Sequence, residues 1–230
     1  MYLRSLYLLD QYIPSDNKFP FSIPTIKTLK ELNFKSNVTF FVGENGSGKS
    51  TLLEAIAYKC GFNAAGGGRN NLFEVDSSES ALGDYIRLSW SYKMTNGFFL
   101  RAETFYDFAT YLDLMGNFSS YGNQSLHKQS HGEAFFSLFK NRFGEKSIYL
   151  LDEPEAALSP FRQIAFLNLI KELESDSQFI IATHSPIILG YPNAQILNFD
   201  KAPISEIEYE ETSHFQLTKR FFENKDIFIK

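Results

Sequence analysis

The stretch FFVGENGSGKSTLLEAIAYKC, residues 40–60, decides the fold of this chain, because residues 43–50 match the pattern GxxxxGK[ST] in full. An apolar run, VTFFV at residues 38–42, precedes the match, and residues 51–58 follow it with apolar side chains at helical spacing. Glycines in such a turn let backbone N–H groups point inward at an anion, and the helix N-terminus adds its positive dipole end. The stretch therefore predicts a strand, a phosphate-binding loop and a helix.

Each polar residue of this loop has an expected task toward a bound nucleotide. Lys49 is expected to reach the β and γ phosphates, and Ser50 is expected to place its hydroxyl on Mg²⁺. The other residues expected to bind the nucleotide are Gly43, Asn45, Gly46, Gly48 and Thr51. The loop thus predicts a nucleotide bound together with Mg²⁺.

The bulk composition indicates an ordinary soluble globular protein, with 43% hydrophobic and 21% charged residues over 230 positions. The length suits one full-sized α/β domain. A net charge of -5 argues against a generally basic surface of the kind that binds nucleic acid or anionic membranes. The 24 Phe and 12 Tyr residues predict a Phe-rich core rather than a base-stacking platform.

The cellular setting is also expected from the sequence. Cys60 is the single cysteine, so an intramolecular disulfide and a thiolate-rich metal site are both excluded, which suits a reducing compartment. The N-terminal residues do not resemble a signal peptide, and no stretch approaches the roughly 18 apolar residues of a membrane span. We expect a cytoplasmic protein with no direct insertion into a membrane.

The spacing of apolar residues predicts a parallel α/β sheet, because short apolar runs alternate with a helical segment. A helix is expected over 160–173. An edge or antiparallel strand is expected over 85–93. Residues 61–71 are expected to form a loop, residues 106–115 a helix, and the tail from Ser205 onward is expected to close the domain. The expected buried strands are residues 38–42, 147–151, 179–182 and 195–199.

Two carboxylates follow the second of these strands, in SIYLLDEPEAALSP at residues 147–160. Ligands bind at the carboxyl ends of the strands in an open parallel sheet, so Asp152 can approach the Mg²⁺ opposite the loop. Glu153, one residue later, is placed to polarise the attacking water as a general base. Such a pair is a weak signal alone, since acidic residues often cap helices, but together with the phosphate loop it predicts a nucleotide hydrolase.

A histidine ends the next predicted strand, in FIIATHSP at residues 179–186. An imidazole at that position can hydrogen-bond the γ phosphate and the water, and so sense whether the terminal phosphate is present. His184 is therefore the second candidate catalytic residue, although a lone histidine at a strand end is more often structural.

In this order the motifs resemble the ATP-binding-cassette superfamily, specifically its soluble branch of small ATPases related to the chromosome-maintenance and break-repair ATPases. GENGSGKST stands as Walker A, LLDEPEAALSP as Walker B running into the D-loop, and ATHSP as the switch histidine. QSHGEAFF, residues 129–136, stands where such proteins carry a signature loop. Ser130 and Gly132 keep that pattern, while His131 and Glu133 depart from it. SHGE also fits a capping box that starts a helix over 133–143.

The resemblance implies a P-loop NTPase fold with an ABC-ATPase-like sheet, flanking helices and a small antiparallel and helical signature subdomain. It implies one domain over residues 1–230, with a signature lobe inserted at about 61–140. It implies ATP and Mg²⁺ as cofactors and a head-to-tail homodimer that encloses two ATP molecules, with Ser130 and Gly132 on the γ phosphate bound to the other subunit.

Other family positions are assigned with less support from the residues. Residues 156–159 resemble the D-loop that crosses the dimer interface. No glutamine stands where the family has its Q-loop; Glu103 is a candidate for that region, and Arg101 a candidate phosphate contact. Tyr7 and Tyr12 are candidates for stacking on adenine.

Two functions fit these motifs best, and a nucleotide-dependent interaction protein that binds ATP but hydrolyses little is a third alternative. The first is a soluble ATPase whose dimer closes on ATP, opens after hydrolysis and transmits that movement to a nucleic acid or an effector protein. The second is the ATP-binding subunit of an ABC transporter. The altered signature, the missing glutamine and DEPEAAL in place of the usual transporter sequence favour the first. Lys49 and Asp152 are 103 positions apart, which leaves no room for a long coiled-coil arm between them.

Overall fold

A six-stranded sheet forms the centre of the molecule, with strand order β5-β6-β7-β3-β8-β9. The computed structural model describes residues 1–13, 18–63, 82–102, 105, 110, 131–144 and 146–229. The first five strands of the sheet are parallel to their neighbours, and β9 pairs antiparallel with β8. The strands are β3 (Val38–Val42), β5 (Gly97–Arg101), β6 (Ile148–Asp152), β7 (Gln178–Ala182), β8 (Gln195–Asn198) and β9 (Ser205–Glu206). The expected parallel α/β sheet is confirmed.

The central strands are apolar on both faces because each face is covered. All five residues of β3, β6 and β7 are buried. Successive side chains point to opposite sides of the sheet. Phe40 of β3 accordingly joins one core and Phe41 the other. These strands therefore read as continuous hydrophobic runs rather than as alternating ones.

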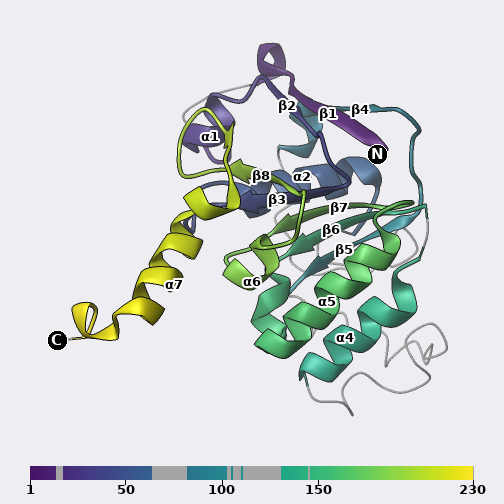
Figure 1. Cartoon of the computed structure of the whole chain (residues 1–230). Coiled ribbons are helices and arrows are strands. Elements are labelled where there is room, and N and C mark those ends of the chain that lie inside the picture. The colour runs from purple at the N-terminus through teal and green to yellow at the C-terminus, as the bar shows by residue number, and fades with distance from the viewer. Residues whose placement is uncertain are drawn as a thin grey trace.

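Helices cover one face of the sheet and a second, smaller sheet lies beyond the other (Figure 1). On the first face α4 (His131–Arg142), α5 (Pro160–Leu173) and the short α6 (Pro186–Leu189) pack against the sheet. On the second face α2 (Lys49–Cys60) lies between the six-stranded sheet and the three-stranded one. Both cores meet the strand ends at which the motif residues emerge.

The small sheet is antiparallel, with order β2-β1-β4. Its strands are β1 (Leu3–Leu8), β2 (Glu31–Asn33) and β4 (Ile86–Trp90). The carboxamide of Gln178, on β7, accepts from the backbone N–H of Leu3 at 2.8 Å and donates to the carbonyl of Leu3 at 3.0 Å. This buried side chain ties the small sheet to the main one. The expected edge or antiparallel strand at 85–93 is confirmed as β4, while β1 and β2 were not predicted.

Aromatic side chains fill much of the core between the main sheet and α4 and α5. Phe139 of α4 stacks on Phe166 of α5 at 4.7 Å between ring centroids. Phe143 stacks on Tyr149 of β6 at 4.1 Å, and Tyr149 on Phe179 of β7 at 5.0 Å. These rings bear out the expected Phe-rich core, and Cys60 is buried and forms no disulfide.

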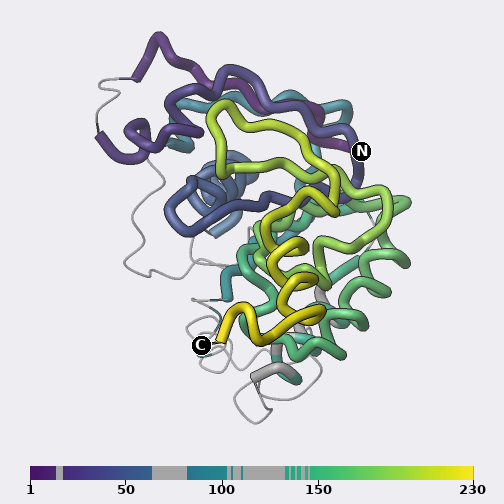
Figure 2. Tube along the Cα trace, turned by 60° about the vertical axis from the view of Figure 1, so that its left-hand side comes forward, coloured from purple at the N-terminus to yellow at the C-terminus, as the bar shows by residue number. Residues whose placement is uncertain are grey.

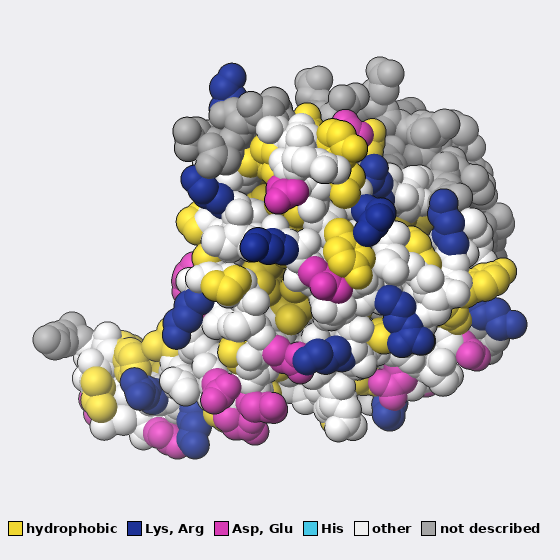
Figure 3. Space-filling model, turned by 90° about the horizontal axis from the view of Figure 1, so that it is seen from above, with side chains coloured by type: hydrophobic (Ala, Val, Ile, Leu, Met, Phe, Trp, Pro, Cys, Tyr) yellow, Lys and Arg dark blue, Asp and Glu magenta, His cyan; other side chains and the backbone are white. Residues whose placement is uncertain are grey.

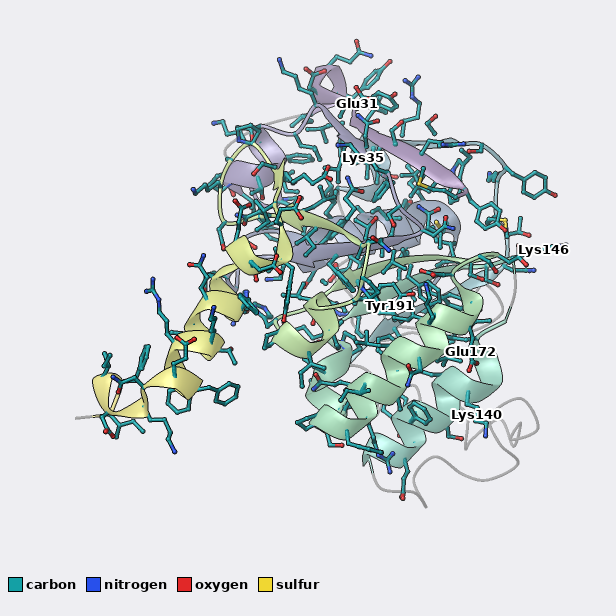
Figure 4. All side chains as sticks on the ribbon, viewed as in Figure 1. Glu31, Lys35, Lys140, Lys146, Glu172 and Tyr191 are labelled. Atoms are coloured by element: carbon teal, nitrogen blue, oxygen red, sulfur yellow. The ribbon has the colours of Figure 1, made fainter. Side chains whose placement is uncertain are left out.

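A tyrosine after α6 connects two elements on this side of the sheet. Tyr191, labelled in Figure 4, donates its hydroxyl to the carboxylate of Glu174 at 2.6 Å. Burial raises the pKa of Tyr191, and the adjacent carboxylate raises it further. This hydrogen bond holds the segment after α6 against the C-terminal end of α5.

The tail from Ser205 onward divides into two parts. Strand β9 extends the main sheet, and the 3-10 helix η6 (Tyr209–Glu211) follows it. Helix α7 (Ser213–Glu223) then runs away from the body and carries the C-terminus with it (Figures 1 and 2). No residue of α7 is buried. The expectation that the tail closes the domain is therefore right for β9 and wrong for α7.

The structure tests only part of what was expected for the middle of the chain, residues 61–140. Strand β5, inside the 61–140 range expected to hold an inserted lobe, pairs with β6 in the main sheet, and β4 pairs with β1. The expected loop over 61–71 and the expected helix over 106–115 lie largely outside the described residues. Within the part of the chain that the structure describes, no helix is both long and apolar enough to cross a membrane.

The surface shown in Figure 3 carries both signs of charge. Lys and Arg side chains alternate there with Asp and Glu side chains over the described residues. This mixture agrees with the acidic total and gives that face no continuous basic patch.

Candidate functional site

The phosphate-binding loop connects β3 to α2, as the sequence predicts. Gly48 has φ of +102°, and an added Cβ would lie 2.9 Å from Oγ1 of Thr25, so only glycine fits there. Thr25 in turn donates its hydroxyl to the carbonyl of Ser47 at 2.5 Å. Asn45 and Gly46 lie in the same turn, and Thr51 lies in the first turn of α2. The loop therefore has a fixed backbone in front of the helix N-terminus.

An aspartate after β8 holds the other end of the loop. Oδ1 of Asp200 accepts from the backbone N–H of Glu44 at 2.6 Å. Gly43, at φ of +150°, packs so closely that an added Cβ would lie 3.0 Å from the same oxygen. Asp200 was not predicted from the sequence, because nothing near it marks a motif and its partner is 156 positions away.

Lys49 is buried at the start of α2 and folds back over the loop. Its Nζ donates to the carbonyls of Gly43 at 2.6 Å and Glu44 at 3.0 Å. Burial lowers the pKa of Lys49, while the nearby carboxylates of Glu153 and Asp152 oppose that shift. The ammonium group is thus centred on the loop, where phosphate oxygens would replace the two carbonyls as acceptors.

The structure brings Ser50 and Asp152 together. Oγ of Ser50 donates to Oδ1 of Asp152 at 3.0 Å, although the residues are 102 positions apart. Asp152 is buried at the carboxyl end of β6, and this burial raises its pKa to about 7, against the opposing effects of Arg101 and of the Ser50 hydrogen bond. The Ser50 hydroxyl and the buried Asp152 carboxylate therefore place two oxygen atoms close together, where both could bind one metal ion.

The oxygen atoms of Ser50 and Asp152 fit Mg²⁺ as ligands. The ion prefers octahedral oxygen ligands and usually binds through one or two protein groups, with the rest supplied by phosphates and water. Ser50 and Asp152 would hold it, and a cation beside Asp152 would compensate the buried charge that its raised pKa reflects. The described residues contain no cluster of three or more His, Cys, Asp or Glu side chains that could hold a metal ion.

Arg101 lies beside this pair rather than free at the end of β5. Its Nη1 is 2.7 Å from a carboxylate oxygen of Glu54 and its Nε is 3.6 Å from Oδ2 of Asp152. The predicted contact of Arg101 with phosphate remains a prediction. Glu103, the other candidate near the end of β5, lies outside the described residues.

Glu153 leaves the strand in an unusual backbone conformation. It has φ of +51° and ψ of 50°, a left-handed conformation that costs a non-glycine residue about 1 kcal/mol or more. Its backbone N–H still donates to the carbonyl of Ala182 on β7 at 2.9 Å. The turn directs the chain away from the sheet and leaves the Glu153 side chain 41% exposed at the strand end.

His184 faces Glu153 from the end of the neighbouring strand. Its Nε2 lies 3.7 Å from a carboxylate oxygen of Glu153. Burial lowers the pKa of His184, and the positive charge of Lys49 lowers it further. The two predicted catalytic side chains therefore lie together, with the imidazole favoured in its neutral form.

A second glutamate of DEPEAAL, Glu155, holds the backbone of this histidine. One oxygen of its carboxylate accepts from the N–H of His184 at 2.5 Å, and burial raises the pKa of Glu155. Sequence analysis did not single out Glu155. Its signal was available in the carboxylate-rich turn after β6, but only the strand pairing shows which backbone group it meets.

The expected D-loop is joined to the segment after His184 through one buried side chain. Gln163 of α5 donates to the carbonyl of Leu158 at 3.0 Å and accepts from Oγ of Ser185 at 2.5 Å. Ser185 caps α6, and Ser159 caps α5 by accepting from the N–H of Arg162. The two segments that follow β6 and β7 therefore behave as one connected unit.

The remaining candidates have separate outcomes. Ser130 lies outside the described residues, and Gly132 lies in the first turn of α4, which begins at His131. Tyr7 lies on β1 with the guanidinium of Arg87 5.0 Å above its ring, and Tyr12 is an exposed residue near the N-terminus. Their roles toward ATP remain predictions.

A family model described as an AAA domain matches residues 22–180, which include the phosphate loop and the carboxylates after β6. No protein with curated annotation is significantly similar to the chain.

Solved structures resemble the whole fold at low sequence identity. The SMC head domain from Thermotoga maritima is 20% identical, with 90% of this chain and 100% of that chain covered and a TM-score of 0.50. MJ1267, an ATP-binding cassette of an ABC transporter, is 15% identical, with both chains covered fully and a TM-score of 0.51. A nucleotide-free ATP-binding cassette from an ABC transporter is 14% identical, again with full coverage, at 0.50. These likenesses establish an ABC-type P-loop ATPase fold.

Proposed function

This chain belongs to the AAA domain family, and we propose that it binds ATP with Mg²⁺ and hydrolyses it to ADP and phosphate. The observation that supports this best is the convergence of four predicted residues at one edge of the sheet. Ser50 contacts Asp152 at 3.0 Å, and Glu153 lies 3.7 Å from His184. Lys49 lies close enough to Glu153 and Asp152 for their charges to raise its pKa against the larger, lowering effect of burial.

Each group has a separate task in the proposed reaction. Lys49 and the loop backbone bind the phosphates, and Ser50 and Asp152 hold Mg²⁺, which neutralises charge on the β and γ phosphates when bound. Glu153 orients the water and accepts its proton. His184 donates a hydrogen bond toward the γ phosphate. Gly43, Asn45, Gly46, Gly48 and Thr51 complete the proposed nucleotide contacts.

We further propose that ATP joins two copies of the chain head to tail. In that arrangement Ser130 and Gly132 of one copy contact the γ phosphate held by the other, so each site is complete only in the dimer. The position of α4 supports this, because its N-terminus can direct backbone N–H groups at an anion. Closing and opening of the dimer would then move a nucleic acid or an effector protein.

We favour this soluble ATPase over a transporter subunit. The solved structures that resemble the fold include both kinds of protein and do not separate them. The altered signature at residues 129–136 and the absence of a glutamine after β5 favour the soluble branch. We propose one ATPase domain over residues 1–230, located in the cytoplasm, with the signature lobe inside residues 61–140.

Phosphate release by the purified protein tests the proposed chemistry. The wild-type protein should hydrolyse ATP only with Mg²⁺ present, and Glu153→Gln should reduce kcat by about 100-fold or more because the general base is lost. Glu172→Gln, a change of the same type at an exposed position of α5, is the matched control and should retain wild-type kcat. An unchanged kcat in Glu153→Gln would remove Glu153 from this role.

A further inference from the structure

A second histidine contacts the imidazole of His184. Nδ1 of His184 lies 2.9 Å from Nε2 of His214, with the two ring centroids 5.0 Å apart. His214 lies in the first turn of α7, the helix that leaves the body of the molecule. Neither the sequence motifs nor the matched family range, residues 22–180, includes it. The contact therefore joins the site to an element that no motif predicted.

The contact between Nδ1 of His184 and Nε2 of His214 is a hydrogen bond only when one of the two nitrogens carries a proton and the other accepts it. Burial lowers the pKa of both histidines, so both rings are favoured as neutral imidazoles, each with one N–H and one acceptor nitrogen. The hydrogen bond can then run in only two directions. If His184 donates, its Nε2 is left as an acceptor; if His214 donates, the Nε2 of His184 carries the proton.

The neighbours of the pair favour the second direction. The Nε2 of His184 faces a carboxylate oxygen of Glu153 at 3.7 Å, an acceptor that cannot donate when ionised. At the far side, Nδ1 of His214 lies 3.4 Å from the hydroxyl of Ser213, which can donate to it. Each group then has a matching partner: the Ser213 hydroxyl donates to His214, His214 donates to His184, and His184 presents an N–H at its Nε2.

That N–H has no hydrogen-bond partner among the described residues. The Nε2 atom of His184 is buried and lies beyond hydrogen-bond distance of Glu153. A buried donor without an acceptor costs about 1–3 kcal/mol unless a ligand supplies one. An oxygen of the γ phosphate is the acceptor that the proposed reaction would bring to this place.

The start of α7 is held firmly enough to position His214. Thr212, fully buried, accepts from the N–H of Phe215 at 3.3 Å and so caps the helix. Its hydroxyl donates to the carbonyl of Tyr209 at 2.7 Å, and the Tyr209 hydroxyl donates to the carbonyl of Pro186 at 2.8 Å. Pro186 is two residues after His184, so the helix start and the histidine are anchored to the same segment.

We propose that His214 is a positioning residue, which holds His184 in the tautomer that presents its Nε2 proton to the γ phosphate of ATP. This inference rests on the proposed ATPase function and deepens it. It makes α7 a control element of the site: displacement of the helix start removes the donor that fixes the His184 ring.

Nitrogen-15 NMR of the full chain labelled in histidine tests the tautomer directly. The wild-type spectrum should show Nε2 of His184 as a protonated nitrogen and Nδ1 as an unprotonated one. His214→Gln should preserve that pattern, because its carboxamide N–H can replace the imidazole Nε2–H, whereas His214→Ala should lose it. A proton on Nδ1 of His184 in the wild-type protein would overturn the proposal.

Steady-state kinetics of the same proteins tests the consequence. His214→Ala should lower kcat about 10-fold with little change in KM, a loss typical of removing the partner that orients a functional histidine. His214→Gln should retain most of the wild-type kcat, and Leu217→Ala, an exposed change on the same helix, should have no effect. Equal losses in the Gln and Ala variants would contradict the proposal. A wild-type protein without ATPase activity would refute the proposed function, while the NMR pattern would still decide the tautomer.

Discussion

At the scale of single residues, Asp152 carries a conflict between stability and function. Its folded-state pKa of about 7 is far above the ordinary value of 3.8, so between pH 4 and 7 the folded protein holds a proton that the unfolded chain releases. The free energy of unfolding therefore falls, through this group, as pH rises across that window. Above pH 7 the metal-free protein bears the full cost of a buried carboxylate.

Replacing this carboxylate should consequently stabilise the metal-free protein. Asp152→Asn is expected to raise the free energy of unfolding at pH 8 by up to about 4 kcal/mol, the equivalent of the three-unit pKa difference, and to have little effect near pH 4. Urea unfolding at both pH values measures it, with the exposed change Asp226→Asn as a control. Mg²⁺ with nucleotide should stabilise the wild-type protein and not the variant. A variant less stable than wild type at pH 8 would contradict this account.

Lys49 is the residue on which we expect the affinity for ATP to depend. Among the described residues, its Nζ donates hydrogen bonds to two carbonyls of the loop, so Lys49→Ala should keep the fold and weaken ATP binding at least about 10-fold through the loss of a charged contact to phosphate. Isothermal titration measures this. Lys59→Ala, at an exposed position of the same helix, should bind like the wild type. Unchanged affinity in Lys49→Ala would exclude the expected role.

Residue types at fixed spacing made much of this site predictable. The phosphate loop, the carboxylates after β6 and His184 were each found from a short motif next to an apolar strand. Asp200, Glu155 and His214 were not found, because each acts through a contact with a residue distant in sequence and has no local signature. A carboxylate in a polar turn has many possible partners until the strand order is known.

At the scale of elements, a buried side chain of α5 connects this helix to the start of α6, and its contribution to stability can be measured. Gln163 bridges the Leu158 carbonyl and the Ser185 hydroxyl in a buried position. Gln163→Ala removes the donor to the Leu158 carbonyl and the acceptor of the Ser185 hydroxyl proton, although Ser185 keeps its capping bonds from the N–H groups of Ile187 and Ile188, and should lower the free energy of unfolding by about 1–3 kcal/mol. Chemical denaturation measures this loss. Ile164→Ala, an exposed neighbour on the same helix, should change stability by less than about 0.5 kcal/mol, and equal losses would contradict the role of the bridge.

The predictability of the elements followed their burial. Strands buried on both faces were found within a residue of their ends, as was α5, because a continuous apolar run and a 3.6-residue period are strong local signals. Strands β1 and β2 were missed, since β1 pairs with β2 and with the distant β4 and is tied to the main sheet by the side chain of Gln178. The tail from Ser205 onward was expected to close the domain, and the position of α7 away from the body was not predicted, because the local sequence does not say which surface a helix contacts.

At the scale of the whole molecule, the central claim is that ATP joins two copies. A single chain places the phosphate loop, Asp152, Glu153 and His184 at the carboxyl ends of the strands, while Gly132 lies in the first turn of α4, whose Glu133 is 3.5 Å from Arg162 of α5. The motifs are thus present in one chain, and a second copy would supply the signature residues to each nucleotide.

The mass of Glu153→Gln in solution tests this claim most directly, because the variant should bind ATP without hydrolysing it. Light scattering should give the 26.3 kDa monomer without nucleotide and with ADP, and twice that mass with saturating ATP and Mg²⁺. The double variant Lys49→Ala/Glu153→Gln should stay monomeric throughout. A monomer of Glu153→Gln at saturating ATP, with ATP binding shown by titration, would contradict the proposed dimer.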